Sequence, residues 1–231
     1  DLDPAAYFQQ FSFVVSGPLQ VPALRQAWAN ALARHAVLRT ALAWADRDHP
    51  VQTVRHTVDL PWTFLDWRHR DASRRAQDFD AFLADDRKRG FDLQRAPLFR
   101  CTLIQETDTR HRFCWSAHHI ILDGWSTATL MKEVFDDYLS LARTGMPAVA
   151  ASAPGYRAYI DWLARHPRSA DETWWRAELA GFKAATPVAA SPARQATGDA
   201  ARQDKRRTQQ FLLDEVLAAR LQALTRTHRV T

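Results

Sequence analysis

The sequence contains only two cysteines, Cys101 and Cys114, and no apolar run approaching the ~20 residues that a membrane-spanning helix needs. Two thiols in a chain of 231 residues are typical of reduced core residues, not of a disulfide framework, although both lie in neighbouring strand-like segments. We expect neither a redox nor a metal role for them. No basic and apolar signal segment opens the chain, so we predict a cytoplasmic protein without a membrane partner.

The positive charge is also not concentrated in a patch of the kind that binds nucleic acid. The formal net charge is +5, mostly from scattered arginines, and could favour an acidic partner such as a carrier protein. The one dense basic run, Arg202–Arg207, has no interleaved aromatic residues of the kind that stack on bases. We interpret this run as solvated. With 46% hydrophobic residues, the chain is long enough to bury a sizeable core.

The stretch that carries the chemistry is Phe113–Ser126. It begins with alternating apolar residues, which predicts a strand ending at a pair of histidines. An Asp-Gly pair follows after three aliphatic residues, and the spacing beyond it predicts a helix from about Trp125 to Arg143. A strand end, reactive side chains, a glycine and a helix start therefore follow one another directly.

Each of these residue types has a chemical use. Histidine titrates near neutral pH, so His119 could take a proton from an attacking amine or hydroxyl and return it. Asp123 is expected to be a buried structural clamp that needs a cationic partner. Gly124 allows a sharp turn and close approach of a substrate. The helix start beyond it offers amide donors to a developing oxyanion. A lone histidine at a strand end is usually structural, so the hypothesis depends on the whole string.

The string His-His-x-x-x-Asp-Gly-Trp-Ser resembles the central motif of condensation domains of nonribosomal peptide synthetases, within the HHxxxDG acyltransferase superfamily. The resemblance implies that His119 is the histidine tied to catalysis and that His118, Asp123 and Gly124 are the other motif residues of the catalytic site. It also implies that two residues at the helix start line the substrate channel. These two residues are Trp125 and Ser126.

A second string, Arg-His-Ala-Val-Leu-Arg-Thr from Arg34 to Thr40, resembles the second motif of the same family. Alternation from Leu38 to Trp44 predicts a strand whose leucines face away from Arg39. Arg39 could be an edge-strand residue that reaches solvent. From the resemblance we predict instead that it is the buried partner of Asp123. Arg34 is a weaker candidate because it falls in the last turn of a predicted helix.

A third string, Tyr156 to Leu163, resembles the fourth motif of the family, but Ala158 stands where an aspartate is usual. For this stretch we therefore predict only helix packing. We predict a loop over residues 61–68. The segment 98–105 and the segment around Phe113 are predicted to form a hairpin. A further strand is predicted over Thr208–Leu213.

The resemblance implies an α/β fold, a chloramphenicol-acetyltransferase-like two-layer lobe in which a mixed sheet is packed with helices. We assign residues 1–181 to the N-terminal lobe, 182–207 to a connecting segment, and 208–231 to the truncated start of a C-terminal lobe. The family has two such lobes with a tunnel between them. We therefore expect a fragment of a longer domain.

The function implied is formation of a peptide bond between a carrier-bound aminoacyl or peptidyl thioester and a carrier-bound aminoacyl amine. The implied partners are upstream and downstream peptidyl carrier proteins and an adjacent adenylation domain. Substrates would arrive on 4′-phosphopantetheine, and the chain itself would bind no cofactor and no metal. The alternatives are an acyl-CoA-dependent starter acyltransferase, an epimerisation domain and a non-catalytic scaffold. Trp125 and Ser126 disfavour the epimerisation domain, and the intact His119 and Asp123 disfavour the scaffold.

Overall fold

The computed structural model describes residues 7–44, 49–148, 155–184 and 211–230. The chain divides into two compact units, residues 1–166 and 167–231, and each unit is described by itself. The boundary falls inside the region 1–181 that the sequence assigns to one lobe. The lobe boundaries stay predictions.

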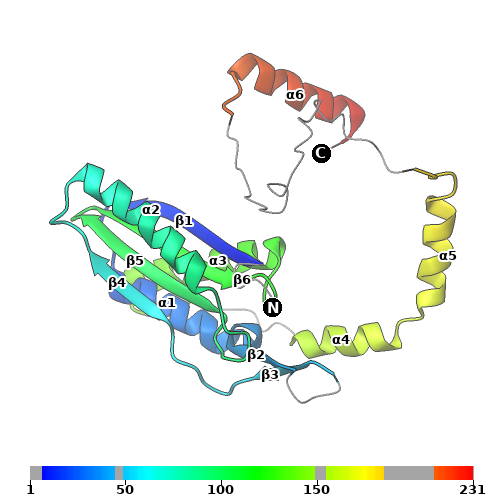
Figure 1. Cartoon of the computed structure of the whole chain (residues 1–231), viewed down its shortest axis with the longest axis horizontal. Helices are drawn as coiled ribbons and strands as arrows, with labels where there is room; N and C mark the ends of the chain where they lie inside the picture. The colour runs from blue at the N-terminus through cyan, green and yellow to red at the C-terminus, as the bar shows by residue number, and fades with distance from the viewer. Residues whose placement is uncertain (1–6, 45–48, 149–154, 185–210, 231) are drawn as a thin grey trace, which may run out of the picture. The chain divides into compact units, whose positions relative to one another are not determined.

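A four-stranded mixed sheet forms the centre of the first unit (Figure 1). In spatial order its strands are β1 (Phe8–Ser16), β6 (Arg110–His118), β5 (Phe99–Thr107) and β4 (Trp62–Asp66). β6 is antiparallel to both β1 and β5, whereas β4 is parallel to β5. A two-residue turn joins β5 to β6, so the predicted hairpin is confirmed. The prediction of a mixed sheet packed with helices is also confirmed.

Helices cover both faces of the sheet (Figure 1). α1 (Val21–Arg34) and α3 (Gly124–Thr144) pack on one face, and α2 (Ala72–Arg89) packs on the other. The larger core lies under α1 and α3, where the ring centroid of Trp28 is 5.7 Å from that of Phe113. α2 therefore adds a helical layer to the two layers that the sequence predicts.

The alternation along β6 decides which side chains meet which helices. Trp115, an odd-numbered residue, belongs to the larger core, whereas Cys114 and Ser116 face α2. Cys101 lies opposite Trp115 in the ladder and belongs to the larger core. The two cysteines are thus free and buried on opposite faces of the sheet. Burial raises the pKa of both thiols, that of Cys114 to about 11, which keeps them protonated and unreactive.

Two local predictions are wrong. The strand expected from Leu38 begins only at Thr40, because residues 36–39 form a 3-10 turn (η1, Ala36–Arg39) in which the Thr40 hydroxyl donates to the Val37 carbonyl at 2.7 Å. β2 (Thr40–Ala43) then pairs with β3 (Val51–Val54) in a separate two-stranded sheet. The loop expected over 61–68 contains β4, since a segment that pairs with the buried β5 gains its backbone hydrogen bonds there.

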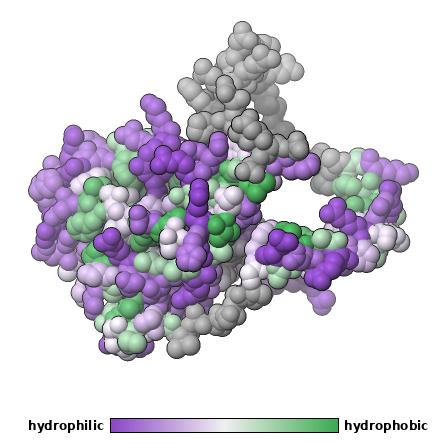
Figure 2. Space-filling model, turned by 90° about the horizontal axis from the view of Figure 1, so that it is seen from below, coloured by the Kyte–Doolittle hydropathy of each residue, from purple (hydrophilic) through white to green (hydrophobic). Residues whose placement is uncertain are grey.

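Among the helices of the described residues, three have no buried residue. These are α4 (Tyr156–Arg165) in the first unit, and α5 (Arg168–Glu178) and α6 (Glu215–His228) in the second. Figure 2 shows apolar surface on α4 and α5. In the strand predicted over 208–213, residues 208–210 lie outside the described residues and 211–213 are irregular, so the described part contradicts that prediction. Among the described helices, none has an apolar stretch of membrane-spanning length.

Candidate functional site

The two histidines of the central string lie at the end of β6 and have opposite environments. His118 is the last residue of the strand and is 8% exposed, whereas His119 is exposed. The His119 amide donates to the Tyr7 carbonyl at 2.8 Å, which extends the β1–β6 pairing by one residue. The sheet therefore fixes the backbone of His119 and leaves its side chain open to solvent.

The ring of His119 is held in one tautomer. Its Nδ1 lies 2.6 Å from the Leu122 carbonyl oxygen. A carbonyl oxygen only accepts hydrogen bonds, so Nδ1 carries the proton in the neutral ring and Nε2 keeps a free lone pair. An exposed side chain with an unprotonated Nε2 can accept a proton from an attacking amine.

His118 has the opposite arrangement. Its Nδ1 accepts a hydrogen bond from the Ile120 amide at 3.2 Å, so in the neutral ring the proton lies on Nε2. The ring is also 6.2 Å from the ring of Tyr7, centroid to centroid. His118 thus shapes the turn that follows β6, and of the two rings that of His119 is the exposed one.

Asp123 caps the N-terminus of α3. Its Oδ1 accepts from the Ser126 amide at 2.7 Å. Hydrogen bonding from Ser126 lowers the pKa of the Asp123 carboxyl. The side chain is exposed, so the carboxylate is solvated and capped and needs no buried cationic partner.

The predicted ion pair between Arg39 and Asp123 is wrong. The Arg39 guanidinium donates to backbone carbonyls, among them those of Leu32 at 3.1 Å and His56 at 3.0 Å. Ala33 and Arg55 supply the other two acceptors. The 3-10 turn directs Arg39 towards the C-terminal carbonyls of α1, which have no partner within the helix.

The residues after Asp123 are open to solvent. Gly124 is the first residue of α3, and a Cβ built on it meets no atom within 4 Å. It is not among the glycines with positive φ, so the open space, and not an unusual backbone conformation, is what distinguishes this position. Trp125 is 87% exposed and Ser126 is also exposed.

Sequence reasoning missed the residue that joins the two strings. Glu133 of α3 binds both Arg34 and His35 at the end of α1, with N–O distances of 3.0 and 2.7 Å. Burial raises the pKa of Glu133, but the hydrogen bonds from His35 and Arg34 outweigh it and lower the net pKa. The signal was weak, because a glutamate within a helix is usually solvated.

The comparisons with known proteins identify the family of the chain. A family model for the condensation domain matches residues 1–231. The chain belongs to the condensation-domain family. The predicted family is therefore confirmed. In the described ranges of this condensation-domain chain, no three or more His, Cys, Asp and Glu side chains are grouped to hold a metal ion.

A curated relative is one of the proteins that make up linear gramicidin synthase of Brevibacillus parabrevis, 37% identical over 226 residues. The alignment covers 97% of the condensation-domain chain and 3% of the relative. A similar solved structure is the starter condensation domain of rhizomide synthetase RzmA, mutant R148A, with a TM-score of 0.66 and 20% identity, covering 78% of this chain and 44% of that one. Another is the first condensation domain of the calcium-dependent antibiotic synthetase, in complex with substrate analogue 2a, with a TM-score of 0.63 and 22% identity, covering 81% and 45%. These two structures support the fold, and the chain spans less than half of each.

Proposed function

We propose that this chain supplies the histidine-bearing part of a domain that forms peptide bonds between two carrier-bound substrates. The donor would be an aminoacyl or peptidyl thioester, and the acceptor would be an aminoacyl amine. The observation that carries the proposal is the exposed ring of His119, whose Nδ1 is hydrogen-bonded to the Leu122 carbonyl and whose Nε2 has no hydrogen-bond partner among the described residues.

In the proposed reaction the acceptor amine attacks the thioester carbonyl. His119 Nε2 orients the amine and accepts its proton as the C–N bond forms. The C–S bond then breaks, and the departing thiolate takes up that proton. Positioning contributes much of the rate, because effective molarities of well-placed reactants reach about 10⁵ M or more.

The start of α3 suits the oxyanion that develops on the carbonyl oxygen. Of its first amides, that of Ser126 donates to Asp123 Oδ1 and that of Thr127 donates to the Asp123 carbonyl. The amides of Gly124 and Trp125 have no acceptor among the described residues. They lie at the positive end of the helix, beside the open space at Gly124, and favour a negatively charged oxygen there.

The proposed partners follow from the substrates. Two peptidyl carrier proteins would present the donor and the acceptor on 4′-phosphopantetheine, and an adjacent adenylation domain would activate an amino acid. The chain would bind no cofactor of its own. Support comes from the family and from relatives that are parts of peptide synthases. A four-domain nonribosomal peptide synthetase is among the similar solved structures.

The alternative is a starter acyltransferase that takes an acyl-CoA donor. It is favoured by one observation, namely that starter condensation domains, including a mutant solved with C8-CoA, are among the similar structures. The same histidine would serve both donors. Supplying an acyl-CoA in place of the donor carrier distinguishes the two functions.

The test uses an intact condensation domain that contains this chain, with loaded donor and acceptor carriers and mass spectrometry of the product. We expect His119→Ala to reduce the rate of dipeptide formation by about 10²–10⁴-fold, the usual contribution of a general base. His69→Ala is the matched control, because His69 is also exposed but precedes α2. Equal product from the wild type and His119→Ala would refute the proposal.

A further inference from the structure

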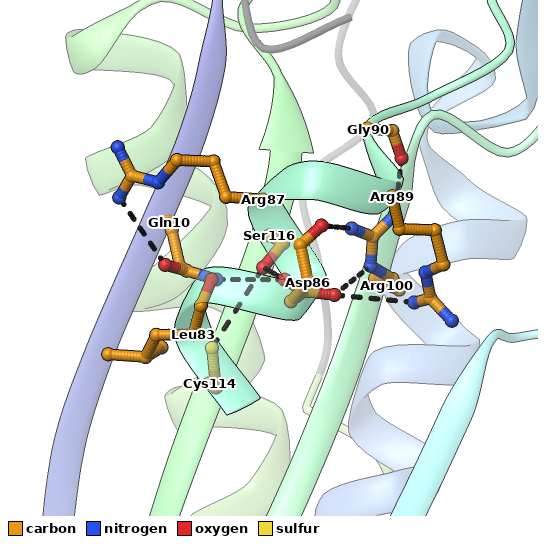
Figure 3. A network of polar contacts seen from close by, with 9 residues as sticks. All are labelled: Gln10, Leu83, Asp86, Arg87, Arg89, Gly90, Arg100, Cys114 and Ser116. Carbon is orange, nitrogen blue, oxygen red and sulfur yellow. Dashed lines mark hydrogen bonds and ion pairs between the residues drawn. The ribbon is translucent and has the colours of Figure 1, made fainter. Parts of the chain in front are cut away.

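A row of three polar residues crosses the sheet two residues before His118 and three before His119. Gln10 of β1, Ser116 of β6 and Arg100 of β5 lie directly opposite one another in the two ladders. All three side chains point to the α2 side and converge on Asp86 near the end of that helix (Figure 3). Residues far apart in the sequence therefore meet at one carboxylate.

The hydrogen bonds of this carboxylate are short, and the ion pair that it forms is largely buried. Asp86 Oδ2 accepts from Gln10 Nε2 at 2.8 Å and from Ser116 Oγ at 2.5 Å, and Oδ1 accepts from Arg100 Nε at 2.5 Å (Figure 3). The side chains of Asp86 and Arg100 are only 4% and 11% exposed. A buried ion pair of this kind is stabilising only when its remaining polar groups are also satisfied.

Arg100 satisfies that condition and joins the row to α2. Its other two nitrogens donate to the carbonyls of Asp86 at 2.6 Å and Gly90 at 2.8 Å. Both carbonyls lie at the C-terminal end of α2, where a carbonyl has no amide partner within the helix. Arg89 adds a peripheral ion pair to Asp86 at 3.3 Å. The network thus links the end of α2 to β1, β6 and β5.

The row of His118 lies two residues further along β6, beyond the row of Ala117. Phe8 lies opposite His118, and the Arg100 guanidinium lies over the rings of Phe8 at 5.4 Å and Phe91 at 4.3 Å. One residue further on, His119 is bound through its amide to the β1 side of the sheet. The Asp86 network and His119 are therefore three residues apart along the chain of β6 and its continuation, with the rows of Ala117 and His118 between them.

We infer that Asp86 is a positioning residue for His119: by fixing the register of β1, β6 and β5 at the row of Ser116, three residues before His119, it holds the His119 backbone and so the Nδ1 contact with Leu122. The inference rests on the proposed function. Asp86 is buried and does not touch substrate. It acts through Ser116 and the strand that Ser116 shares with the histidines.

The chain offers a matched control for this inference. Glu106 of β5 is a second buried carboxylate that binds arginines of the same sheet, and its side chain, like that of Asp86, is 4% exposed. It binds two arginines, Arg110 and Arg112, but at the turn end of the β5–β6 hairpin. Loss of either carboxylate should lower stability, whereas only the loss of Asp86 should disturb His119.

The experiment compares Asp86→Asn with Glu106→Gln in an intact condensation domain that contains this chain. Asparagine retains the size of the side chain but removes the charge that pairs with Arg100. We expect Asp86→Asn to lower kcat by about 10- to 100-fold with little change in KM, the consequence of a small misplacement of the reacting group. Glu106→Gln should leave both values close to the wild type.

A second readout is independent of catalysis. Nitrogen NMR of ¹⁵N-labelled histidine reports the tautomer, and the His119 signal is assigned by its loss in His119→Ala. We expect the Nδ1-protonated tautomer in the wild type and in Glu106→Gln, and a mixture of tautomers in Asp86→Asn. This result would stand even if the domain formed no peptide bond, so the two proposals can fail separately.

If Asp86→Asn does not fold, Ser116→Ala removes one contact of the carboxylate and is measured in the same two ways. A folded Asp86→Asn or Ser116→Ala protein with wild-type kcat and an unchanged His119 tautomer would overturn the inference. So would equal changes in Asp86→Asn and Glu106→Gln.

Discussion

The two ends of the β5–β6 hairpin use the same electrostatic device for different purposes. At each end a buried carboxylate on the α2 side of the sheet binds arginines from neighbouring strands, Asp86 with Arg100 at one end and Glu106 with Arg112 at the other. At the Asp86 end the chain continues into an exposed histidine. At the Glu106 end it closes in a turn. The comparison shows the same kind of buried ion pair at both ends of the hairpin, and what differs is the exposed group that follows, which in the proposed function is His119.

The contacts at the turn end stabilise the hairpin and its packing on α2. The Arg112 guanidinium lies 4.4 Å from the ring centroid of Phe79 on α2, and Arg75 of α2 donates to the Glu106 carbonyl. Burial raises the pKa of Glu106, but hydrogen bonds from Arg112 and Arg110 outweigh it, and the net pKa is lowered. All of these contacts join β5, β6 and α2 to one another, and none of them involves His118 or His119.

The largest effect should come from breaking the turn end. Glu106→Ala leaves Arg112 without its buried partner, and we expect a loss of about 3 kcal/mol, the lower end for a broken buried pair, because Arg110 is half exposed and can be solvated. Urea unfolding measures the loss. The kcat of the folded fraction should stay at the wild-type value. A large fall in kcat of the folded protein would show that the two ends of the hairpin are coupled.

At the histidine end, Asp123→Ala tests whether that aspartate is a cap or a buried clamp. Since Asp123 is exposed and binds the Ser126 amide, we expect the cost of a lost N-cap, a decrease in Tm on the order of 2–4 °C. The change in Tm should be well below that of Glu106→Ala. Thermal unfolding of both variants measures this difference.

The double variant with Arg39→Ala is the control for Asp123→Ala. Because Arg39 binds backbone carbonyls and not Asp123, the two changes in stability should add. Strong non-additivity would restore the ion pair that the sequence predicts.

The sequence predicts well what depends on local pattern. The alternation in Phe113–His118 predicts a strand, the following apolar spacing predicts α3, and the string after the strand identifies His119. It also predicts the hairpin, since a turn signal separates two apolar runs. These features are set by residues close to one another in the chain.

The sequence does not predict contacts that depend on register and distance. Asp86 meets Gln10 and Ser116 only because three strands align and a helix ends above them, and no local pattern encodes that meeting. The Arg39–Asp123 pair was wrong for the same reason, because a 3-10 turn at Ala36–Arg39 changes the direction of Arg39. Buried polar contacts are thus the part of the site that requires the structure.

Gly124→Ala tests whether the histidine end changes function without losing stability. Because the new methyl group meets no atom and the backbone has no positive φ, we expect a small stabilisation of about 0.4–1 kcal/mol. The value of kcat/KM should fall, because the methyl group occupies the space that the substrate carbonyl approaches. Chemical denaturation and steady-state assays measure the two quantities. A stabilised variant of undiminished kcat/KM would show that substrates do not approach Gly124.

The smallest effect should be a pH dependence at the turn end. His111 lies opposite Gln105 in the hairpin and is buried, and within the described residues its Nδ1 has no hydrogen-bond partner. Burial, with a smaller contribution from the charge of Arg68, lowers the pKa of His111 below its usual 6.5. As pH falls through 6.5, the unfolded chain therefore binds a proton before the folded chain does. The stability from the neutral ring is complete above pH 6.5 and is lost as pH falls towards the lowered pKa.

Thermal unfolding between pH 7.5 and 5 measures this loss. His111→Phe removes the titrating group and should flatten the curve, whereas His69→Ala, a change at an exposed histidine, should not. The kcat of the folded protein should be the same in both variants and the wild type at each pH. His111 lies near the start of β6, whereas His119, the proposed base, follows its last residue. An unchanged pH slope in His111→Phe would mean that the acid sensitivity originates elsewhere in the protein. The end of β6 that carries His118 and His119 would then be tested first.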